Sequence, residues 1–111
     1  MTSCIGCAIV SVQRIIYLME NKEALKGMLH PSELQVMKGD HLAGIIAAKE
    51  AFFKALGESP PRWLDVEATR EKNGRPRFTL SPDLSQRISK CDMSISHDGD
   101  YTVAFVMLEL Q

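Results

Sequence analysis

The first part of the chain combines a short apolar run with positions that recur at helical spacing. Residues 4–10 (CIGCAIV) are apolar and rich in β-branched side chains, which predicts a buried strand. Ser11 then has the side chain of a helix N-cap, and an apolar stripe follows it, so we expect a helix that stops near Asn21. The residues of that stripe are Val12, Ile15, Ile16 and Met19.

The longest predicted helix runs from Asp40 to Leu56. Before it, residues 30–33 (HPSE) are typical of a turn that leads into a short helix ending at Met37. We expect Asp40 to cap the long helix and Gly57 to end it. Its apolar residues share one face, which predicts packing against a core: Leu42, Ile45, Ile46, Phe52, Phe53 and Leu56.

Three charged residues of this helix have different positions relative to the apolar stripe. Lys49 falls in the middle of it, whereas Glu50 and Lys54 lie on its flank, one turn apart. From periodicity alone, the Lys49 stem would follow the apolar surface and carry the ammonium to water. Glu50 and Lys54 would then form a surface salt bridge worth about 0.3–0.5 kcal/mol.

A first hairpin is predicted after the proline pair at positions 60 and 61. Residues 63–69 alternate apolar and polar side chains, residues 72–76 (KNGRP) are typical of a turn, and the chain returns through residues 77–80. A short amphipathic helix over residues 81–89 follows, with a proline in its first turn.

A second hairpin is predicted at the end of the chain. Residues 93–96 alternate, residues 97–100 (HDGD) supply the turn, and residues 101–110 form the last strand. Both faces of that strand are apolar, so it needs cover from its own helices or from another subunit. A polar residue at Val106 is therefore expected to break an assembly.

Composition and charge narrow the class of protein. The 111 residues are 45% hydrophobic and 24% charged, which predicts a single domain over residues 1–111. A net charge of −1 argues against a dedicated nucleic-acid binder, because neutralising phosphates requires a basic excess. The sequence shows neither a signal-peptide pattern nor an apolar run of about 20 residues. We therefore expect a cytoplasmic protein without membrane contact.

The three cysteines give no metal or disulfide pattern. Their number is odd and small, unlike a disulfide framework. Cys4 and Cys7 spell C-x-x-C, but an odd offset along a strand points the two side chains to opposite faces. No second pair with zinc spacing accompanies them. We interpret Cys4, Cys7 and Cys91 as small, buried hydrophobic residues.

Four segments, in order over nearly the whole chain, carry a resemblance to a known family. They are residues 6–10 (GCAIV) before Arg14, 47–57 (AAKEAFFKALG), 73–76 (NGRP) and 94–98 (SISHD). Together they resemble holo-acyl-carrier-protein synthase, the small trimeric type of phosphopantetheinyl transferase. The resemblance implies an α+β fold in which one long helix packs on a mainly antiparallel sheet, and a homotrimer that shares its sites between subunits. It also implies transfer of the phosphopantetheine arm of coenzyme A to a serine of apo acyl carrier protein, releasing adenosine 3′,5′-bisphosphate.

The same resemblance implies a role for each matching residue. Glu50 matches the family's magnesium-binding glutamate and would be catalytic. Lys49 and Lys54 would neutralise the pyrophosphate oxygens of coenzyme A, Lys54 as a catalytic residue as well. Arg14 matches a basic position that faces the acidic carrier protein. The coenzyme A-binding set is completed by Gly57, Gly74, Arg75, Pro76, Ser96 and His97.

Read without the resemblance, three of these features have plainer interpretations. Residues 73–74 are simply a hairpin turn. His97 is a hydrogen-bonded turn histidine, and Arg14 is an exposed, solvated arginine. Ligand contact at these positions is therefore an expectation from the family alone.

Three positions depart from the family pattern. Ala8 stands where the family has its second magnesium ligand, an aspartate, and Ser11 stands where many members have a glutamate. Ile45 replaces an arginine that commonly precedes the F-A-A-K-E block. Glu50 is then the only matching metal carboxylate, so coenzyme A phosphates and water would have to complete the shell of Mg²⁺.

Three functions follow from these observations. The chain is an active transferase, a catalytically impaired relative that binds coenzyme A or carrier protein as a regulatory or structural trimer, or an interaction domain that oligomerises through its last strand. For the first, the general base that accepts the serine proton is either a metal-bound water or Glu33. Carrier proteins of fatty acid synthesis and of polyketide synthesis both fit.

Overall fold

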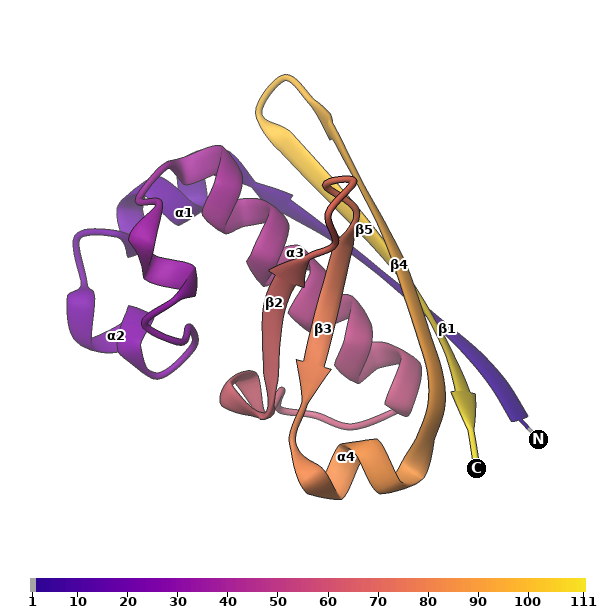
Figure 1. Cartoon of the computed structure of the whole chain (residues 1–111). Helices are drawn as coiled ribbons and strands as arrows, with labels where there is room; N and C mark the ends of the chain where they lie inside the picture. The colour runs from indigo at the N-terminus through magenta and orange to yellow at the C-terminus, as the bar shows by residue number, and fades with distance from the viewer. Residues whose placement is uncertain (1) are drawn as a thin grey trace.

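A long helix packed on one face of a three-stranded antiparallel sheet, against two of its strands, organises the fold (Figure 1). The computed structural model describes residues 2–111. The helix is α3 (Gly39–Leu56), and the strands lie in the order β1 (Thr2–Ser11), β5 (Tyr101–Leu110) and β4 (Ile88–Asp98). The last strand of the chain is therefore the central one, and the predicted α+β fold is confirmed.

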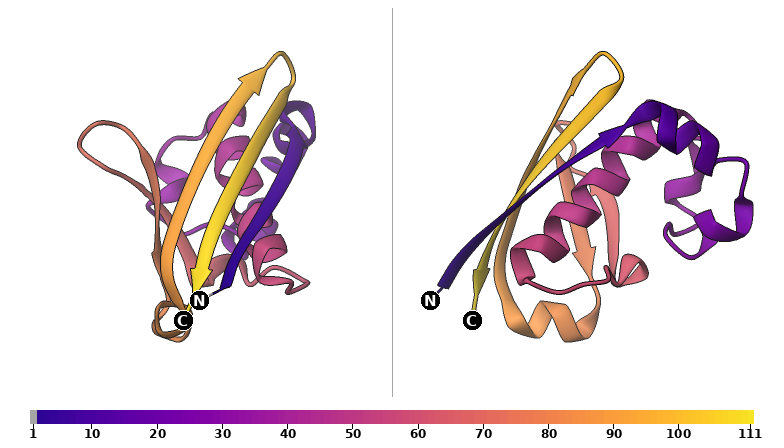
Figure 2. Two further views of the ribbon diagram at one scale, coloured as in Figure 1. Left: turned by 90° about the vertical axis from the view of Figure 1, so that its right-hand side faces the viewer. Right: turned by 180° about the vertical axis from the view of Figure 1, so that it is seen from behind.

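A smaller hairpin stands beside α3 and β4 (Figure 2). It consists of β2 (Val66–Arg70) and β3 (Pro76–Leu80), paired antiparallel. The Phe78 ring packs edge-on against Phe52 of α3, with 5.6 Å between ring centroids, so the hairpin shares the core. The short elements are α1 (Val12–Leu18), α2 (Lys22–Lys26), α4 (Pro82–Arg87) and the 3₁₀ turns η1 (Glu33–Gln35) and η2 (Trp63–Asp65).

Helix α3 rests directly on β1 because the strand has a glycine at the contact. A Cβ atom on Gly6 would lie 2.0 Å from the carbonyl oxygen of Ala51. No side chain fits in that space, so the glycine of the first motif is required by the close approach of strand and helix. Ala8 and Val10 are buried on the same face of β1.

The two faces of the sheet have different surroundings. On β5, Thr102, Ala104, Val106 and Leu108 alternate into the core under α3, whereas the opposite face has no cover within the described chain. On that outer face large apolar side chains remain exposed: Ile5 (76%), Ile9 (60%), Tyr101 (55%) and Phe105 (55%). The prediction that Val106 lies at an interface is wrong, because this side chain belongs to the core of its own subunit.

Several predicted elements are confirmed with shifts at their ends. The Ser11 hydroxyl accepts the backbone N–H of Arg14, as an N-cap should, and Gly57 ends α3 with φ +72°, the left-handed conformation that glycine adopts readily. Both hairpins form, as does the short helix α4.

Other local predictions are wrong. Asp40 lies in the first turn of α3 rather than capping it, and the N-cap position is Lys38. Residues 22–26 form α2 where no helix is predicted, and the predicted strand over residues 63–69 begins only at Val66. His97 lies in β4 rather than in the turn, and Cys7, expected to be buried, is exposed on β1. Among the described residues, no helix is long and apolar enough to cross a membrane.

Candidate active site

Lys49 is held inside the core by three acceptors from different parts of the chain. Its Nζ lies 2.7 Å from Glu33 Oε1, 2.8 Å from the Met28 carbonyl oxygen and 3.1 Å from the Trp63 carbonyl oxygen. Neither side chain of the Lys49–Glu33 pair is exposed. Burial lowers the pKa of Lys49 below its ordinary value of 10.5, and the hydrogen bond and charge of Glu33 oppose that shift.

This geometry contradicts two predictions for Lys49. The ammonium does not reach water along the apolar surface, since the whole side chain is enclosed. It also has no N–H left for a pyrophosphate, because an ammonium has three donors and all three have acceptors here. Lys49 is a structural residue whose counter-charge comes from its own chain.

Both carboxylate oxygens of Glu33 likewise accept hydrogen bonds. Oε1 accepts the backbone N–H of His30 at 2.6 Å as well as Lys49, and Oε2 accepts the backbone N–H of Ala68 at 2.7 Å. The carboxylate thereby joins the turn η1 to α3 and β2. A buried group with both oxygens committed is not placed to take a proton from a carrier serine, so the alternative of Glu33 as general base is contradicted.

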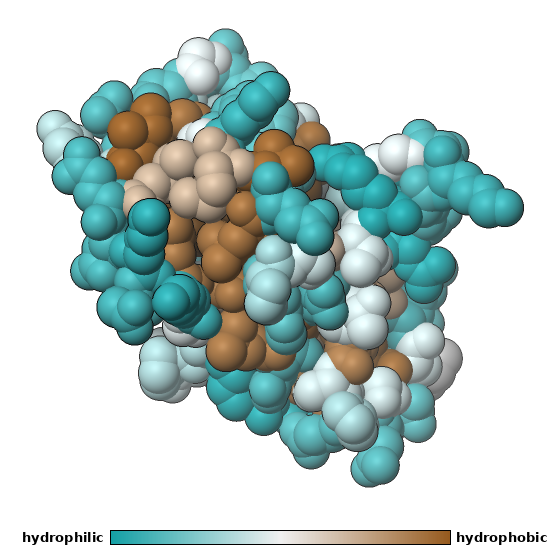
Figure 3. Space-filling view, turned by 60° about the vertical axis from the view of Figure 1, so that its left-hand side comes forward, coloured by the Kyte–Doolittle hydropathy of each residue, from teal (hydrophilic) through white to brown (hydrophobic). Residues whose placement is uncertain are grey.

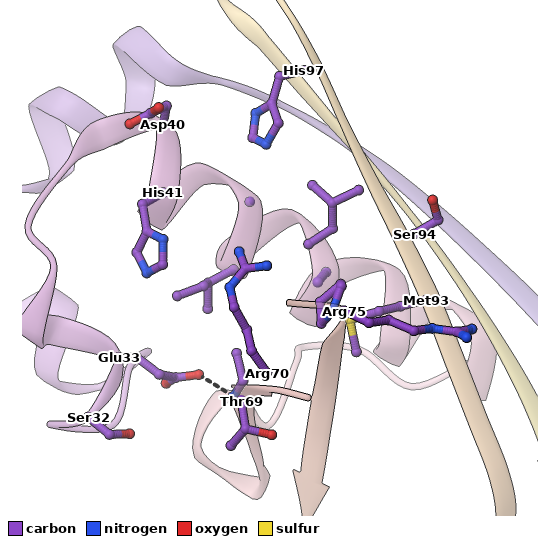
Figure 4. Close-up of a pocket in the computed structure, with 16 residues that line it drawn as sticks. Ser32, Glu33, Asp40, His41, Thr69, Arg70, Arg75, Met93, Ser94 and His97 are labelled. Atoms are coloured by element: carbon purple, nitrogen blue, oxygen red, sulfur yellow. Dashed lines mark hydrogen bonds between the residues drawn. The ribbon is translucent and has the colours of Figure 1, made fainter. Parts of the chain in front are cut away.

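A cavity of about 740 Å³ opens between α3, the β2–β3 hairpin and β4 (Figure 4). The rings of His41 and His97 point into it from α3 and from β4, and the guanidinium of Arg70 points toward the space between them. The floor is apolar. Residues that line it include His41, Gly44, Ile45, Arg70, Pro76 and His97.

The orientation of His97 is fixed by two neighbours. Its Nδ1 lies 3.0 Å from the hydroxyl oxygen of Thr102, which is fully buried in β5. On the α3 side, the ring lies against Gly44, where a Cβ atom would be in ordinary van der Waals contact with His97 Cε1 at 3.7 Å. With Nδ1 held by Thr102, the other ring nitrogen is the one left for a ligand.

Of the other residues predicted to bind the nucleotide, some line the cavity and some do not. Pro76 and Arg75 both line the cavity, but the Arg75 guanidinium pairs with Asp92 of β4 at 3.2 Å and points toward that strand, away from the two histidines (Figure 4). Gly74, with φ +87°, forms the hairpin turn and does not line the cavity. Ser96 does not line it either, because it alternates to the other side of β4 from His97.

Glu50 and Lys54 line a second, smaller hollow of about 260 Å³ at the other end of α3. Arg14 of α1 lies 3.5 Å from Glu50 Oε1, and its side chain is 65% exposed. Lys54 is exposed and has no ion-pair partner within residues 2–111. Within one chain, the predicted set is thus separated into a carboxylate–lysine half and a basic half with His97. Gly57 lines neither hollow.

The donor set fits Mg²⁺ only when the substrate contributes ligands. Glu50 offers a hard carboxylate oxygen at the edge of the smaller hollow. Ala8 has no oxygen donor in its side chain, and the Ser11 hydroxyl is engaged by Asp100 at 2.7 Å. The described residues contain no group of three acidic, histidine or cysteine side chains placed to hold a metal. A magnesium ion with one protein carboxylate and phosphate oxygens is nevertheless a common arrangement.

Comparison with known proteins decides the family. A holo-[acyl-carrier-protein] synthase of Nautilia profundicola is 41% identical over 110 residues, which span 94% of this chain and 97% of that protein. This chain belongs to the holo-[acyl-carrier-protein] synthase family. The family member from Campylobacter hominis is 37% identical and covers 96% of this chain, again with 97% of its own length matched. No family model matches the chain.

Solved structures of family members share the fold. The holo-[acyl-carrier-protein] synthase of Neisseria meningitidis superposes with a TM-score of 0.85 at 35% identity, covering 96% of this chain and 97% of its own. The Helicobacter pylori synthase, solved in complex with coenzyme A, superposes with a TM-score of 0.86 at 32% identity, covering 95% and 99%. The resemblance carried by the four sequence segments is therefore confirmed.

Two residues of the cavity escape the motifs that identify the family. His41 and Arg70 lie outside all four segments, and neither has a spacing that marks a site. For His41, the sequence offers only its position as an indication: it precedes Ile45 by one helical turn and so shares its face of α3. Arg70 closes β2, and only the pairing of β2 with β3 shows that it stands above the same cavity.

Proposed function

We propose that this holo-[acyl-carrier-protein] synthase transfers the phosphopantetheine arm of coenzyme A to a serine of an apo acyl carrier protein. The observation that carries the proposal is the preservation of Glu50 and Lys54 on α3 together with a basic cavity that ends in His97. The serine oxygen forms a bond to the phosphorus that bears pantetheine. The bond from that phosphorus to the bridging oxygen breaks, and adenosine 3′,5′-bisphosphate leaves with that oxygen. The serine proton leaves to solvent or to a bound water.

The chain's own contribution to this reaction is mainly positioning and charge. Phosphoryl transfer requires the reacting groups in line and cations near the phosphate oxygens. Lys54 supplies a free ammonium for the pyrophosphate, and His97 and Pro76 hold the nucleotide end in the larger cavity. Gly74 and Arg75 shape the loop beside it. Gly57 and Ser96, which line neither hollow, contribute only where a neighbouring subunit completes the site.

Mg²⁺ is part of this proposal, with Glu50 as its protein ligand. When bound, the ion neutralises charge on the pyrophosphate and polarises the phosphorus that is attacked. Glu50 lies on the flank of α3 beside Lys54, so the two side chains are able to act on one pyrophosphate. With Ala8 in place of the family aspartate, we expect weaker metal affinity than two carboxylates would give.

A homotrimer explains why the two halves of the site are separate within one chain. The outer face of β1 and β5, with Ile5, Ile9 and Phe105, has the exposed apolar character of an interface. In such an assembly, the Glu50 half of one subunit would face the His97 half of its neighbour. Coenzyme A carries a 3′-phosphate and a 5′-pyrophosphate on one ribose, so it would contact both halves where two subunits bring them together.

The carrier protein would approach from the α1 side. Arg14 is 65% exposed there, so its guanidinium is accessible to the carboxylates of an acidic partner. Apolar residues gather within hydrophilic ones on this side of the molecule (Figure 3), and Ile16 and Tyr17 of α1 are exposed. Such a reaction, between a nucleotide cofactor and a carrier protein, belongs in the cytoplasm.

The proposal is tested by incubating the chain with coenzyme A and an apo acyl carrier protein across a magnesium titration. Intact mass spectrometry of the carrier should show the added phosphopantetheine group, at a rate that rises with Mg²⁺. A carrier that stays unmodified while the chain still binds coenzyme A would instead favour the impaired relative, with a binding or regulatory role. The Arg14–Glu50 ion pair gives that alternative physical support, because it occupies the only family metal carboxylate of this chain.

Substitution of Ala8→Asp should make the stability of the protein depend on magnesium. Ala8 is 3% exposed and faces α3, so a carboxylate there is buried without a partner and should lower the melting temperature of the metal-free protein. Mg²⁺ held by the new carboxylate and Glu50 should then raise it again. Differential scanning fluorimetry with Mg²⁺, and with Ca²⁺ as a second ion, measures this. The native chain is the control, and equal curves with and without Mg²⁺ in the variant would exclude position 8 from the metal site.

Phe105→Asp should dissociate the assembly while the subunit remains folded. Phe105 is 55% exposed on the outer face of the central strand, so a charge there costs little in the monomer but opposes burial between subunits. Light scattering gives the mass, and circular dichroism gives the fold. Val106→Asp is the matched comparison on the adjacent, buried position and should unfold the chain instead. A Phe105→Asp protein with the mass of the native protein would contradict an interface at this face.

A further inference from the structure

The centre of the larger cavity contains an imidazole and a guanidinium that no family motif includes, those of His41 and Arg70. His41 lies in the first turn of α3 and its ring points inward, and Arg70 ends β2 and extends over the same space (Figure 4). One guanidinium nitrogen of Arg70 donates to the Gly74 carbonyl oxygen at 2.7 Å, which fixes the side chain against its own hairpin turn. The other guanidinium N–H groups have no acceptor within residues 2–111.

The acidic groups around this cavity do not pair with the Arg70 guanidinium. Glu33 lines the cavity, but its charge is matched by Lys49 at 2.7 Å. The carboxylate of Asp40 points away from Arg70 in Figure 4, and Arg70 forms no ion pair among the described residues. His41 has no hydrogen-bond partner there either. The cavity therefore has an unpaired guanidinium charge beside an imidazole, above the apolar floor provided by Ile45 and Ala48.

The position of the Arg70 charge is informative because the α3 face of the cavity has no arginine of its own. Ile45 brings an alkyl side chain to the cavity where many family members have an arginine, and His41 precedes it by one turn on the same face. Arg70 reaches the same space from the opposite wall. A guanidinium and an imidazole that converge from two walls suit a phosphate monoester, whose oxygens accept several hydrogen bonds at once.

We infer that Arg70 and His41 bind the ribose 3′-phosphate of coenzyme A and so determine the selectivity of this chain for coenzyme A over its dephosphorylated analogue. The inference rests on the proposed function, since it places the nucleotide end of coenzyme A in this cavity. The pyrophosphate is assigned to Glu50 and Lys54 in the other hollow, which leaves the monoester as the phosphate available to this one. The two residues are specificity-determining and take no part in the bond changes.

The test compares binding of adenosine 3′,5′-bisphosphate with binding of adenosine 5′-monophosphate by isothermal titration calorimetry, which needs no turnover. The native protein should bind the bisphosphate at least about tenfold more tightly, as expected for charge-assisted hydrogen bonds to one additional phosphate. Arg70→Gln should remove most of that preference and leave affinity for the monophosphate unchanged. His41→Asn should reduce it by a smaller factor.

Arg77→Gln is the control for a general loss of positive charge. Arg77 lies on the neighbouring strand β3, is exposed, and pairs with Glu71 at 3.8 Å, so the preference should survive its replacement. Equal affinity of the native protein for the two nucleotides, or an equal loss of both in Arg70→Gln, would overturn the inference while the proposed transfer stands. If neither nucleotide nor coenzyme A binds, the proposed function fails and this inference fails with it.

Discussion

Replacing Lys49 with methionine is expected to destabilise the protein by about 3–5 kcal/mol, the usual cost of removing one partner from a buried ion pair. The Glu33 carboxylate would then be left in the core with its charge uncompensated, since neither side chain of the pair is exposed. Two backbone carbonyl oxygens, of Met28 and Trp63, would lose their donor as well. Urea denaturation followed by circular dichroism measures the loss of unfolding free energy.

Two further variants separate the ion pair from the simple loss of a lysine. Lys54→Met removes an exposed lysine from the same helix and should change the unfolding free energy by less than about 0.5 kcal/mol. The double variant Lys49→Met, Glu33→Leu removes both charges and should recover part of the stability lost by Lys49→Met alone. A Lys49→Met protein as stable as Lys54→Met would mean that the buried pair is not holding η1 against α3.

The pair shows why sequence patterns identify a residue more easily than its role. Lys49 is correctly singled out as a charge in an apolar stripe, but its partner lies 16 positions earlier, in a turn that has no periodicity. Helical spacing relates residues that are three or four positions apart. A partner supplied by tertiary packing lies outside that range, and the family motif alone does not separate a ligand-binding lysine from a structural one.

The faces of the last strand give a second example. The sequence shows that both faces of residues 101–110 are apolar, and this is confirmed. It does not show which face α3 covers, because a period of two assigns residues to two sets without orienting either set. The close contact of Gly6 with Ala51 settles the orientation: β1 pairs with β5 in register, so Val106 opposite Gly6 must face the helix.

The larger cavity is not predictable from the sequence, for a similar reason. Arg75 of the turn motif and His97 of the last motif both line it, from two different walls. The direction of each side chain depends on neighbours from other elements. Asp92 pairs with Arg75 and holds it at the side of the cavity, and Arg70 lies at the centre instead. Residues such as His41, which belong to no repeated pattern, are visible only once the helix and hairpin are placed together.

Glu50→Ala is expected to reduce transfer by at least about a hundredfold, because it removes the carboxylate that matches the family's metal ligand. The fold should be preserved. Glu50 is on the flank of α3, and its ion pair with Arg14, whose own side chain is 65% exposed, is a surface interaction worth no more than about 1 kcal/mol. The measurement is the rate of phosphopantetheine transfer across a magnesium titration, with unfolding curves recorded in parallel.

Two further variants, one of Glu50 and one of Glu58, test whether the charge of Glu50 binds the metal. Glu50→Gln keeps the shape of the side chain and removes its charge, so it should be as inactive as Glu50→Ala if metal binding is the reason. Glu58→Ala removes another carboxylate from the same hollow, one whose pKa is lowered by a hydrogen bond from Arg87 and which serves Arg87 and Arg62 as a partner. That variant should retain transfer. Activity in Glu50→Gln close to that of the native chain would show that the charge is not needed, and the metal would have to be held by coenzyme A phosphates alone.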